Sequence, residues 1–210
     1  MIETYSQLFQ DLLALKFAKF KTKGFYIDIG CGFPSYINNT YTLEKNYEWV
    51  GISLDISSQT NPNDGKSWEE LRNTQMYVLE DALAVDYKEL FKKFNTPAVV
   101  DFLSIDLEPP QLTLDCLYRI PFDDYRFNFI AFETDEYREG GDGRRDISRN
   151  YLDGLGYVFV GGISKQDDFY IHKSLINETF QLFEPENVIS NHAYVSLLED
   201  VNRVGANVQS

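Results

Sequence analysis

The chain has 210 residues, of which 43% are hydrophobic, and this is enough to bury the core of one folded domain. Its 33 acidic residues outnumber 19 Lys and Arg, and the net charge of −14 argues against nucleic acid and anionic membranes as partners. The two distant cysteines form no disulfide framework, no apolar run approaches the roughly 20 residues of a membrane span, and no signal-peptide pattern opens the chain, so we expect a cytoplasmic protein.

The first predicted element is a helix near the N-terminus. Apolar residues recur at helical spacing between Ser6 and Phe20, and Ser6 is a candidate N-terminal cap. We expect residues 1–23 to carry a covering helix, a role favoured over a pocket lid or a subunit contact, within a single domain of residues 1–210. The pattern specifies no oligomeric state.

Strands and helices then alternate along the chain, which predicts a parallel sheet with right-handed crossovers. The four polar residues Lys165–Asp168 join the last two strands and predict an antiparallel hairpin. The predicted fold class is therefore α/β, a Rossmann-like three-layer sandwich with a seven-stranded, mostly parallel sheet whose last strand is antiparallel. Strands are predicted at 25–29, 49–54, 76–79, 98–106, 127–132, 157–160 and 169–171, and helices at 39–46, 68–72, 87–94, 112–118 and 147–155.

A glycine-containing turn follows the first predicted strand. Such sheets bind ligands beyond the carboxyl ends of their strands, and glycine lets the backbone come close to a ligand. The run Asp28-Ile-Gly30-Cys31-Gly32 fits a nucleotide turn, but Ser35 stands where the dinucleotide fingerprint needs a third glycine or alanine. An acid two residues before the first glycine suits a cationic ligand, so Asp28, Gly30, Cys31, Gly32 and Ser35 are candidate cofactor-binding residues.

Acidic residues also end the second and third predicted strands. Asp55 lies about one βαβ step beyond the turn, where a carboxylate can accept hydrogen bonds from both ribose hydroxyls of a nucleoside. Asp81 can accept a hydrogen bond from an adenine amino group, and the small Ala82 beside it leaves room for the ring. Together with Asp28, these acids predict a binding site for a nucleoside that carries a positive charge.

Longer stretches of the chain resemble the FkbM-type family of S-adenosylmethionine-dependent methyltransferases. The resemblance covers roughly residues 25–172. It departs from the family at Pro109, which replaces a glycine, at Asn38, which replaces a serine, and at Asp55, which replaces a glutamate. The matching stretches are Asp28-Ile-Gly-Cys-Gly, Asn39-Thr40-x-x-Leu43-Glu44, Trp49-x-Gly51 with Asp55, Asp101-Phe-Leu-Ser-Ile-Asp106-Leu-Glu108, Gly156-Tyr157 and Asp168-Phe-Tyr-Ile-His172.

The resemblance implies a methyltransferase fold and the transfer of a methyl group from S-adenosylmethionine, with S-adenosylhomocysteine as product. The acceptor is an oxygen, or alternatively a nitrogen, of a small molecule or glycan. Asp106 and Glu108 lie two apart at a strand end and would share a face, as a base, a substrate clamp or metal ligands. Glu133, which ends the fifth predicted strand, is the third candidate catalytic residue.

A metal site is not expected, although paired carboxylates are compatible with a divalent ion. His172 and His192 show no metal-ligand spacing with the cysteines, and His172 is a weaker acid–base candidate. The loops at 57–66 and 134–143 are predicted to shape the acceptor pocket.

Two alternatives stay open from the sequence. One is a nicotinamide-dependent oxidoreductase, which the missing third glycine opposes. The other is a non-catalytic module that binds S-adenosylmethionine on a methyltransferase scaffold, which Pro109 keeps in consideration.

Overall fold

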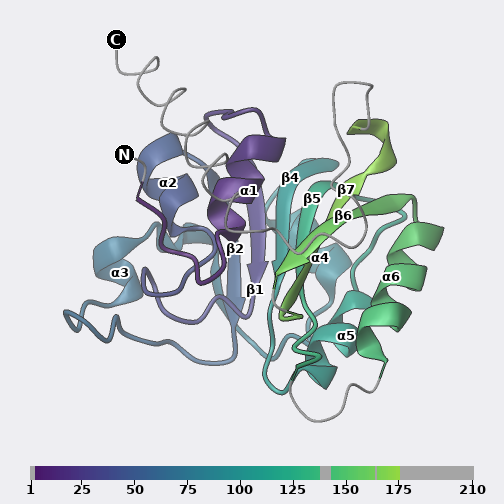
Figure 1. Cartoon of the computed structure of the whole chain (residues 1–210). Coiled ribbons are helices and arrows are strands. Elements are labelled where there is room, and N and C mark those ends of the chain that lie inside the picture. Colours follow the sequence, from purple (N-terminus) through teal and green to yellow (C-terminus); the bar gives the residue numbers. More distant parts are fainter. Residues whose placement is uncertain (1–2, 138–142, 164, 176–210) are drawn as a thin grey trace.

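The computed structural model describes residues 3–137, 143–163 and 165–175, which form one sheet with helices on both faces (Figure 1). The strands are β1 (Phe25–Ile29), β2 (Val50–Asp55), β3 (Tyr77–Leu79), β4 (Val99–Ile105), β5 (Arg126–Glu133), β6 (Tyr157–Ile163) and β7 (Asp167–His172). The α-helices are α1 (Gln10–Phe17), α2 (Tyr41–Tyr47), α3 (Trp68–Leu71), α4 (Tyr87–Lys93), α5 (Gln111–Leu117) and α6 (Arg144–Gly154), with short 3-10 turns at Thr74–Met76 and Lys173–Leu175.

The strands follow the order β3-β2-β1-β4-β5-β7-β6. Strands β1 to β5 pair in parallel, whereas β7 is antiparallel to both of its neighbours. Ile29 at the end of β1 lies opposite Leu54 of β2 and Ile105 of β4, so the carboxyl ends of the central strands meet at one edge. The α/β class, the seven strands and the antiparallel last strand are confirmed, and strand order reverses between β1 and β4, where such sheets bind ligands.

Each face of the sheet has its own apolar core, because successive side chains of a strand point to opposite faces. Ile27 and Ile29 of β1 pack with the buried residues of α4, α5 and α6, whereas Tyr26 packs on the other face with α1 and α2. On that second face the ring of Phe17 in α1 stacks on Phe129 of β5, with 4.9 Å between centroids. Helix α1 therefore lies against the sheet.

The first helix is shorter than predicted, and Ser6 does not cap it. The helix begins at Gln10, because Phe9 adopts a left-handed backbone conformation (φ 62°) that a right-handed helix does not contain. Ser6 lies outside the helix and its hydroxyl donates to Asp11 Oδ1 (2.6 Å).

The predicted polar connection between the last two strands was also too long. Asp167 and Asp168 are buried within β7 and do not belong to the turn. Their burial is tolerated because Gln10 donates to Asp167 (2.7 Å) and two arginines of α6 pair with Asp168, Arg145 at 2.9 Å and Arg149 at 2.6 Å. These partners, which lie far from β7 in the sequence, thus allow the strand to begin at Asp167.

No helix in the described part of the chain has the length and apolarity needed to cross a bilayer. Residues 138–142 of the predicted 134–143 loop, and His192, lie outside the described residues.

Candidate functional site

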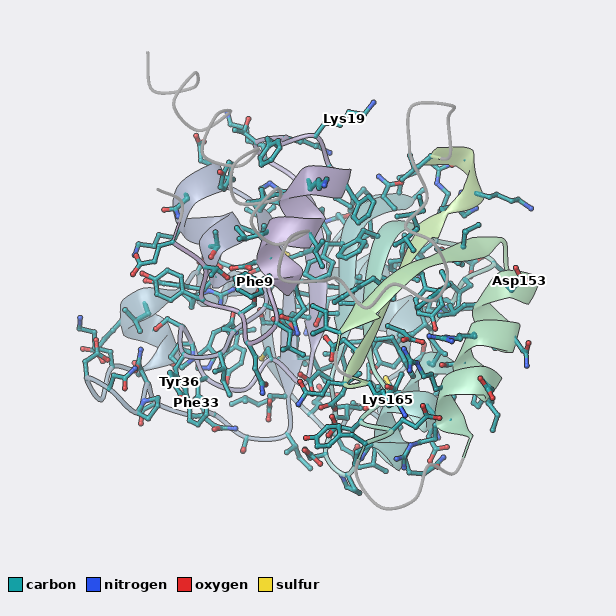
Figure 2. All side chains as sticks on the ribbon, in the orientation of Figure 1. Phe9, Lys19, Phe33, Tyr36, Asp153 and Lys165 are labelled. Carbon is teal, nitrogen blue, oxygen red and sulfur yellow. The ribbon has the colours of Figure 1, made fainter. Side chains whose placement is uncertain are left out.

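A pocket of about 540 Å³ opens at the carboxyl ends of the parallel strands. Figure 2 places Phe33 and Tyr36 on one flank of that edge and Lys165 on the other flank. The pocket is lined by the turn after β1, by residues that end or follow β2, β3, β4 and β5, and by Gln7 and Leu112. It contains ten of the eleven residues predicted from sequence: Asp28, Gly30, Cys31, Gly32, Asp55, Asp81, Ala82, Asp106, Glu108 and Glu133.

The turn after β1 needs glycine at its first position. Gly30 has φ +80°, and a Cβ there would lie 1.7 Å from the carbonyl oxygen of Asp106. The close approach arises because the Asp106 N–H donates to the carbonyl of Ile29 (3.0 Å) and continues the pairing of β1 with β4. Gly32 also has positive φ (+58°), but a Cβ there would meet nothing within 4 Å.

Asp28 forms the buried floor of the pocket, with only 1% of its surface exposed. Thr40 Oγ1 donates to Asp28 Oδ2 (2.9 Å). Burial raises the pKa of Asp28 to about 6, while the Thr40 hydrogen bond and the positive charge of Arg72 act in the opposite direction. Asp28 is therefore a charged group at neutral pH and becomes neutral under mildly acidic conditions.

Asp55 and Asp81 hold the backbone around the pocket. Asp55 Oδ2 accepts from the N–H of Gly32 (2.8 Å), and its Oδ1 accepts from the N–H of Ser57 (3.1 Å). Asp81 Oδ1 accepts from the N–H of Leu83 (2.8 Å). Each carboxylate oxygen has two lone pairs, so both side chains can still accept hydrogen bonds from hydroxyl or amino groups of a ligand.

Ser35 is the one predicted site residue that the structure places outside the pocket lining. Its side chain is buried, and Asn61 donates to its Oγ (2.5 Å), so it joins the turn to the loop before α3. Cys31 does line the pocket, and burial raises the pKa of its thiol well above the usual value, so the sulfur is protonated.

A second group of carboxyls lies on the β4–β5 side of the pocket. Asp106, Glu108 and Glu133 line it, and Asp135 and Asp167 lie beside Asp106 and Glu133 around a small adjoining cavity. Burial, followed by the charge of Asp106 and a hydrogen bond to it, raises the pKa of Glu133 well above its usual range. Burial and the charge of Asp106 likewise raise the pKa of Asp167 to about 8.

Proton sharing explains how several acidic side chains coexist in this group. Neighbouring carboxyl groups repel one another when all are ionised, and the raised pKa of Glu133 favours a proton held within the hydrogen-bonded pair that it forms with Asp106. Its Oε2 atom is buried with no hydrogen-bond partner in the described structure. Within this group, Asp106 is therefore better suited than Glu133 to accept a proton from a substrate.

Three carboxyl groups are close enough to share a cation. Glu108, Glu133 and Asp135 each place one oxygen within 4.8 Å of the others, and oxygen ligands are those that Mg²⁺ and Ca²⁺ prefer.

The weaker candidate His172 lies elsewhere. Because β7 is antiparallel, its last residue lies opposite Tyr157 at the start of β6, at the other edge of the sheet.

The sequence reading missed Gln7 and Leu112 in the lining, Asp135 and Asp167 in the acidic group, and Arg72 behind the turn. None of these residues carries a local signal of its role, and Arg72 stands as the last residue of the short helix predicted at 68–72.

The sequence matches no protein-family model. It also shows no significant match to a curated protein.

Proposed function

We propose that this protein is an S-adenosylmethionine-dependent methyltransferase that methylates an oxygen of a small molecule or glycan. The observation that carries the proposal is the charge of the pocket. Among the described residues that line it none is Lys, Arg or His, whereas six carry carboxyl groups: Asp28, Asp55, Asp81, Asp106, Glu108 and Glu133. Such a lining attracts a cation, and the sulfonium and ammonium groups of S-adenosylmethionine supply two positive charges.

The glycine turn supports the same choice over a nicotinamide dinucleotide. A pyrophosphate is bound by free backbone N–H groups, often with a cationic side chain nearby. Here Asp55 already accepts from the N–H of Gly32, and its negative charge repels a phosphate at that position. The proposed arrangement places the methionyl ammonium near Asp28, the ribose near Asp55 and the adenine near Asp81 and Ala82.

The fold is consistent with this assignment. The seven-stranded sheet with a reversed last strand is the arrangement expected from the resemblance to FkbM-type methyltransferases. The departure at Pro109 lies on the acceptor side, beside Glu108, and leaves the β1–β2 side of the pocket intact.

The bound cofactor would supply an electrophilic methyl group, so the protein has mainly to position the acceptor and remove its proton. In the reaction, a bond forms between the acceptor oxygen and the methyl carbon as the carbon–sulfur bond breaks, and the hydroxyl proton moves to the protein. Asp106 lies at the end of β4, between the glycine turn and Glu133, and we assign it as the base. Glu108 and Glu133 orient the acceptor.

Calorimetry with S-adenosylmethionine and S-adenosylhomocysteine tests the cofactor half of the proposal, with NADH as a control ligand. We expect binding of both sulfur nucleosides and none of NADH, and the opposite result would overturn the proposal. A screen with methyl-labelled donor across hydroxyl-bearing small molecules and glycans tests turnover. Tight binding without transfer to any acceptor would instead favour a non-catalytic binding module.

A further inference from the structure

The arginine that ends α3 is buried behind the glycine turn. The side chain of Arg72 has no exposed surface, although the residue follows the polar loop at 57–66. A buried guanidinium is costly unless its donors and its charge are all satisfied, and here they are. Its donors reach Glu44 Oε2 (2.8 Å), the Pro34 carbonyl (3.0 Å), Asn38 Oδ1 (2.9 Å), the Tyr26 hydroxyl (3.0 Å) and Thr40 Oγ1 (3.0 Å).

The hydrogen bonds around Asn38 fix the direction of its amide. The Nδ2 atom donates to the carbonyls of Cys31 and Phe33, both at 2.9 Å. The Oδ1 atom accepts from Arg72 and from the backbone N–H groups of Thr40 (3.0 Å) and Tyr41 (2.8 Å). The reversed amide would place donors against donors, and the oxygen is already fully used by three N–H groups.

This arrangement leaves the Thr40 hydroxyl proton a single favourable acceptor. Thr40 Oγ1 accepts from Arg72 and has one proton to donate. Asn38 Oδ1 is saturated and lies farther away, at 3.2 Å, whereas Asp28 Oδ2 lies at 2.9 Å. The Thr40 proton therefore points to Asp28, and a hydrogen bond to the ionised form of a carboxyl favours that form.

Several charged and titratable groups on the elements beside β1 affect the charge of Asp28. Asp106 after β4 disfavours its charge, and Arg72 favours it. Asp55 at the end of β2 is a further acid near the turn, the Cys31 thiol is protonated, and Glu44 on α2 partly offsets Arg72 through their ion pair. Among these groups Arg72 is the one positive charge.

We propose that Arg72 is a positioning residue of the pocket, which acts through Thr40 to keep Asp28 ionised and oriented toward a cationic ligand. The residue touches no part of the pocket lining. Its effect is to set the pH below which Asp28 accepts a proton and itself stops attracting a cation. The ligand named in this inference rests on the proposed function, whereas the relay from Arg72 through Thr40 to Asp28 does not.

Neighbouring contacts show that the arginine belongs to the turn and not only to its own helix. Trp68 of α3 donates from Nε1 to the carbonyl of Gly32 (3.2 Å), and its ring lies 4.8 Å from the Arg72 guanidinium. Asn61 donates to Ser35 farther along the same turn (2.5 Å). The segment from Asn61 to Arg72 thus holds the turn at three separate points.

The test is a pair of titrations on the full 210-residue chain. In the ligand-free protein, carbon-13 NMR of labelled Asp carboxyls follows Asp28, with Asp28→Asn identifying its signal. Calorimetry with S-adenosylhomocysteine then gives the affinity at each pH between 5 and 8. Loss of nucleoside binding in the wild-type chain would refute the proposed function but leave the NMR titration as the test of Arg72.

Four substitutions separate the relay from general loss of structure. Arg72→Met and Thr40→Val should each raise the midpoint of the Asp28 titration by about one pH unit. The Thr40→Val variant tests the relay while it retains the arginine. Arg72→Lys retains the positive charge and should raise the midpoint less than Arg72→Met does. Glu44→Gln should move the midpoint downward, because it leaves the charge of Arg72 unopposed.

Opposite signs are the signature of the relay, since simple loosening would move every variant in the same direction. Lys88→Met, which breaks an exposed ion pair with Asp124, should leave the midpoint unchanged. An unchanged midpoint in folded Thr40→Val, or equal shifts in Arg72→Met and Glu44→Gln, would overturn the proposal. Should Arg72→Met fail to fold, Thr40→Val and Glu44→Gln still decide it.

Discussion

The two sides of the pocket carry carboxyl groups in similar number but control their charge differently. On the β1–β3 side, Asp28, Asp55 and Asp81 each accept hydrogen bonds from neighbouring hydroxyl or backbone N–H groups. On the β4–β5 side, Glu133 and Asp167 are surrounded by other acids, and their pKa values rise. On the first side the carboxyl groups are held by hydrogen bonds to the protein, whereas on the second side they hold and exchange protons, and these properties suit cofactor binding and catalysis respectively.

The largest expected effect comes from Gly30, where the turn after β1 meets the backbone that follows β4. Gly30→Ala should lower the free energy of unfolding by about 3 kcal/mol or more, because it combines positive φ with a clash against the end of β4. Gly32→Ala is the matched control and should cost only about 1 kcal/mol, for backbone strain alone. Urea unfolding measures the stability of both variants. Equal losses of stability would show that the backbone around Gly30 can move to accept a Cβ.

The role of the first side in cofactor binding is tested most directly at Asp28. Asp28→Asn should weaken binding of S-adenosylmethionine by about 2–3 kcal/mol at pH 7.5, the usual range for a hydrogen bond to a charged group. Glu108→Gln, which removes an exposed acid from the other side, should have a smaller effect on affinity but a larger one on turnover. The reverse order would refute the division between the two sides.

Asp55 should contribute somewhat less to cofactor binding than Asp28, because both of its carboxylate oxygens already accept hydrogen bonds from backbone N–H groups. Asp55→Ala should weaken cofactor binding by about 1–3 kcal/mol through loss of its hydrogen bonds to the ribose and to Gly32. Asp55→Asn retains an acceptor and should recover part of the loss. Calorimetry that finds an unchanged affinity in Asp55→Ala would remove this residue from the site.

The proton-exchanging side predicts an effect on stability with a distinctive pH dependence. The folded pKa of Asp167 is about 8, above its unfolded value, so the folded state binds more protons and stability falls as pH rises from about 4 to about 8. Asp167→Asn lacks this dependence and should therefore unfold at a higher temperature than the wild type at pH 8.

The stability gain of Asp167→Asn should vanish near pH 4. Asp153→Asn on the exposed part of α6 is the control for the loss of one negative charge. Thermal unfolding at pH 4, 6 and 8 measures the effect, and a gain that does not depend on pH would contradict the assignment.

The sequence predicted the strands and the acids that follow them because both depend on local pattern. Apolar runs ended by Asp55 or Asp106 place a polar group at the edge of a parallel sheet whatever the rest of the chain does. Arg72 was missed because its five partners come from the separate segment 26–44, and no local pattern reports a buried guanidinium. Asp168 was misplaced for the same reason, since two arginines of α6 permit its burial.

Under the proposed function, the six carboxyl groups of the lining have a consequence for how the product leaves after each turnover. S-adenosylmethionine carries one positive charge more than S-adenosylhomocysteine, so methyl transfer discharges the nucleoside while it still lies among the carboxyl groups. The proposed attraction for the donor would therefore weaken once its methyl group has been transferred. Under this proposal, added salt slows loading more than unloading, because screening acts on the cation and spares the neutral product.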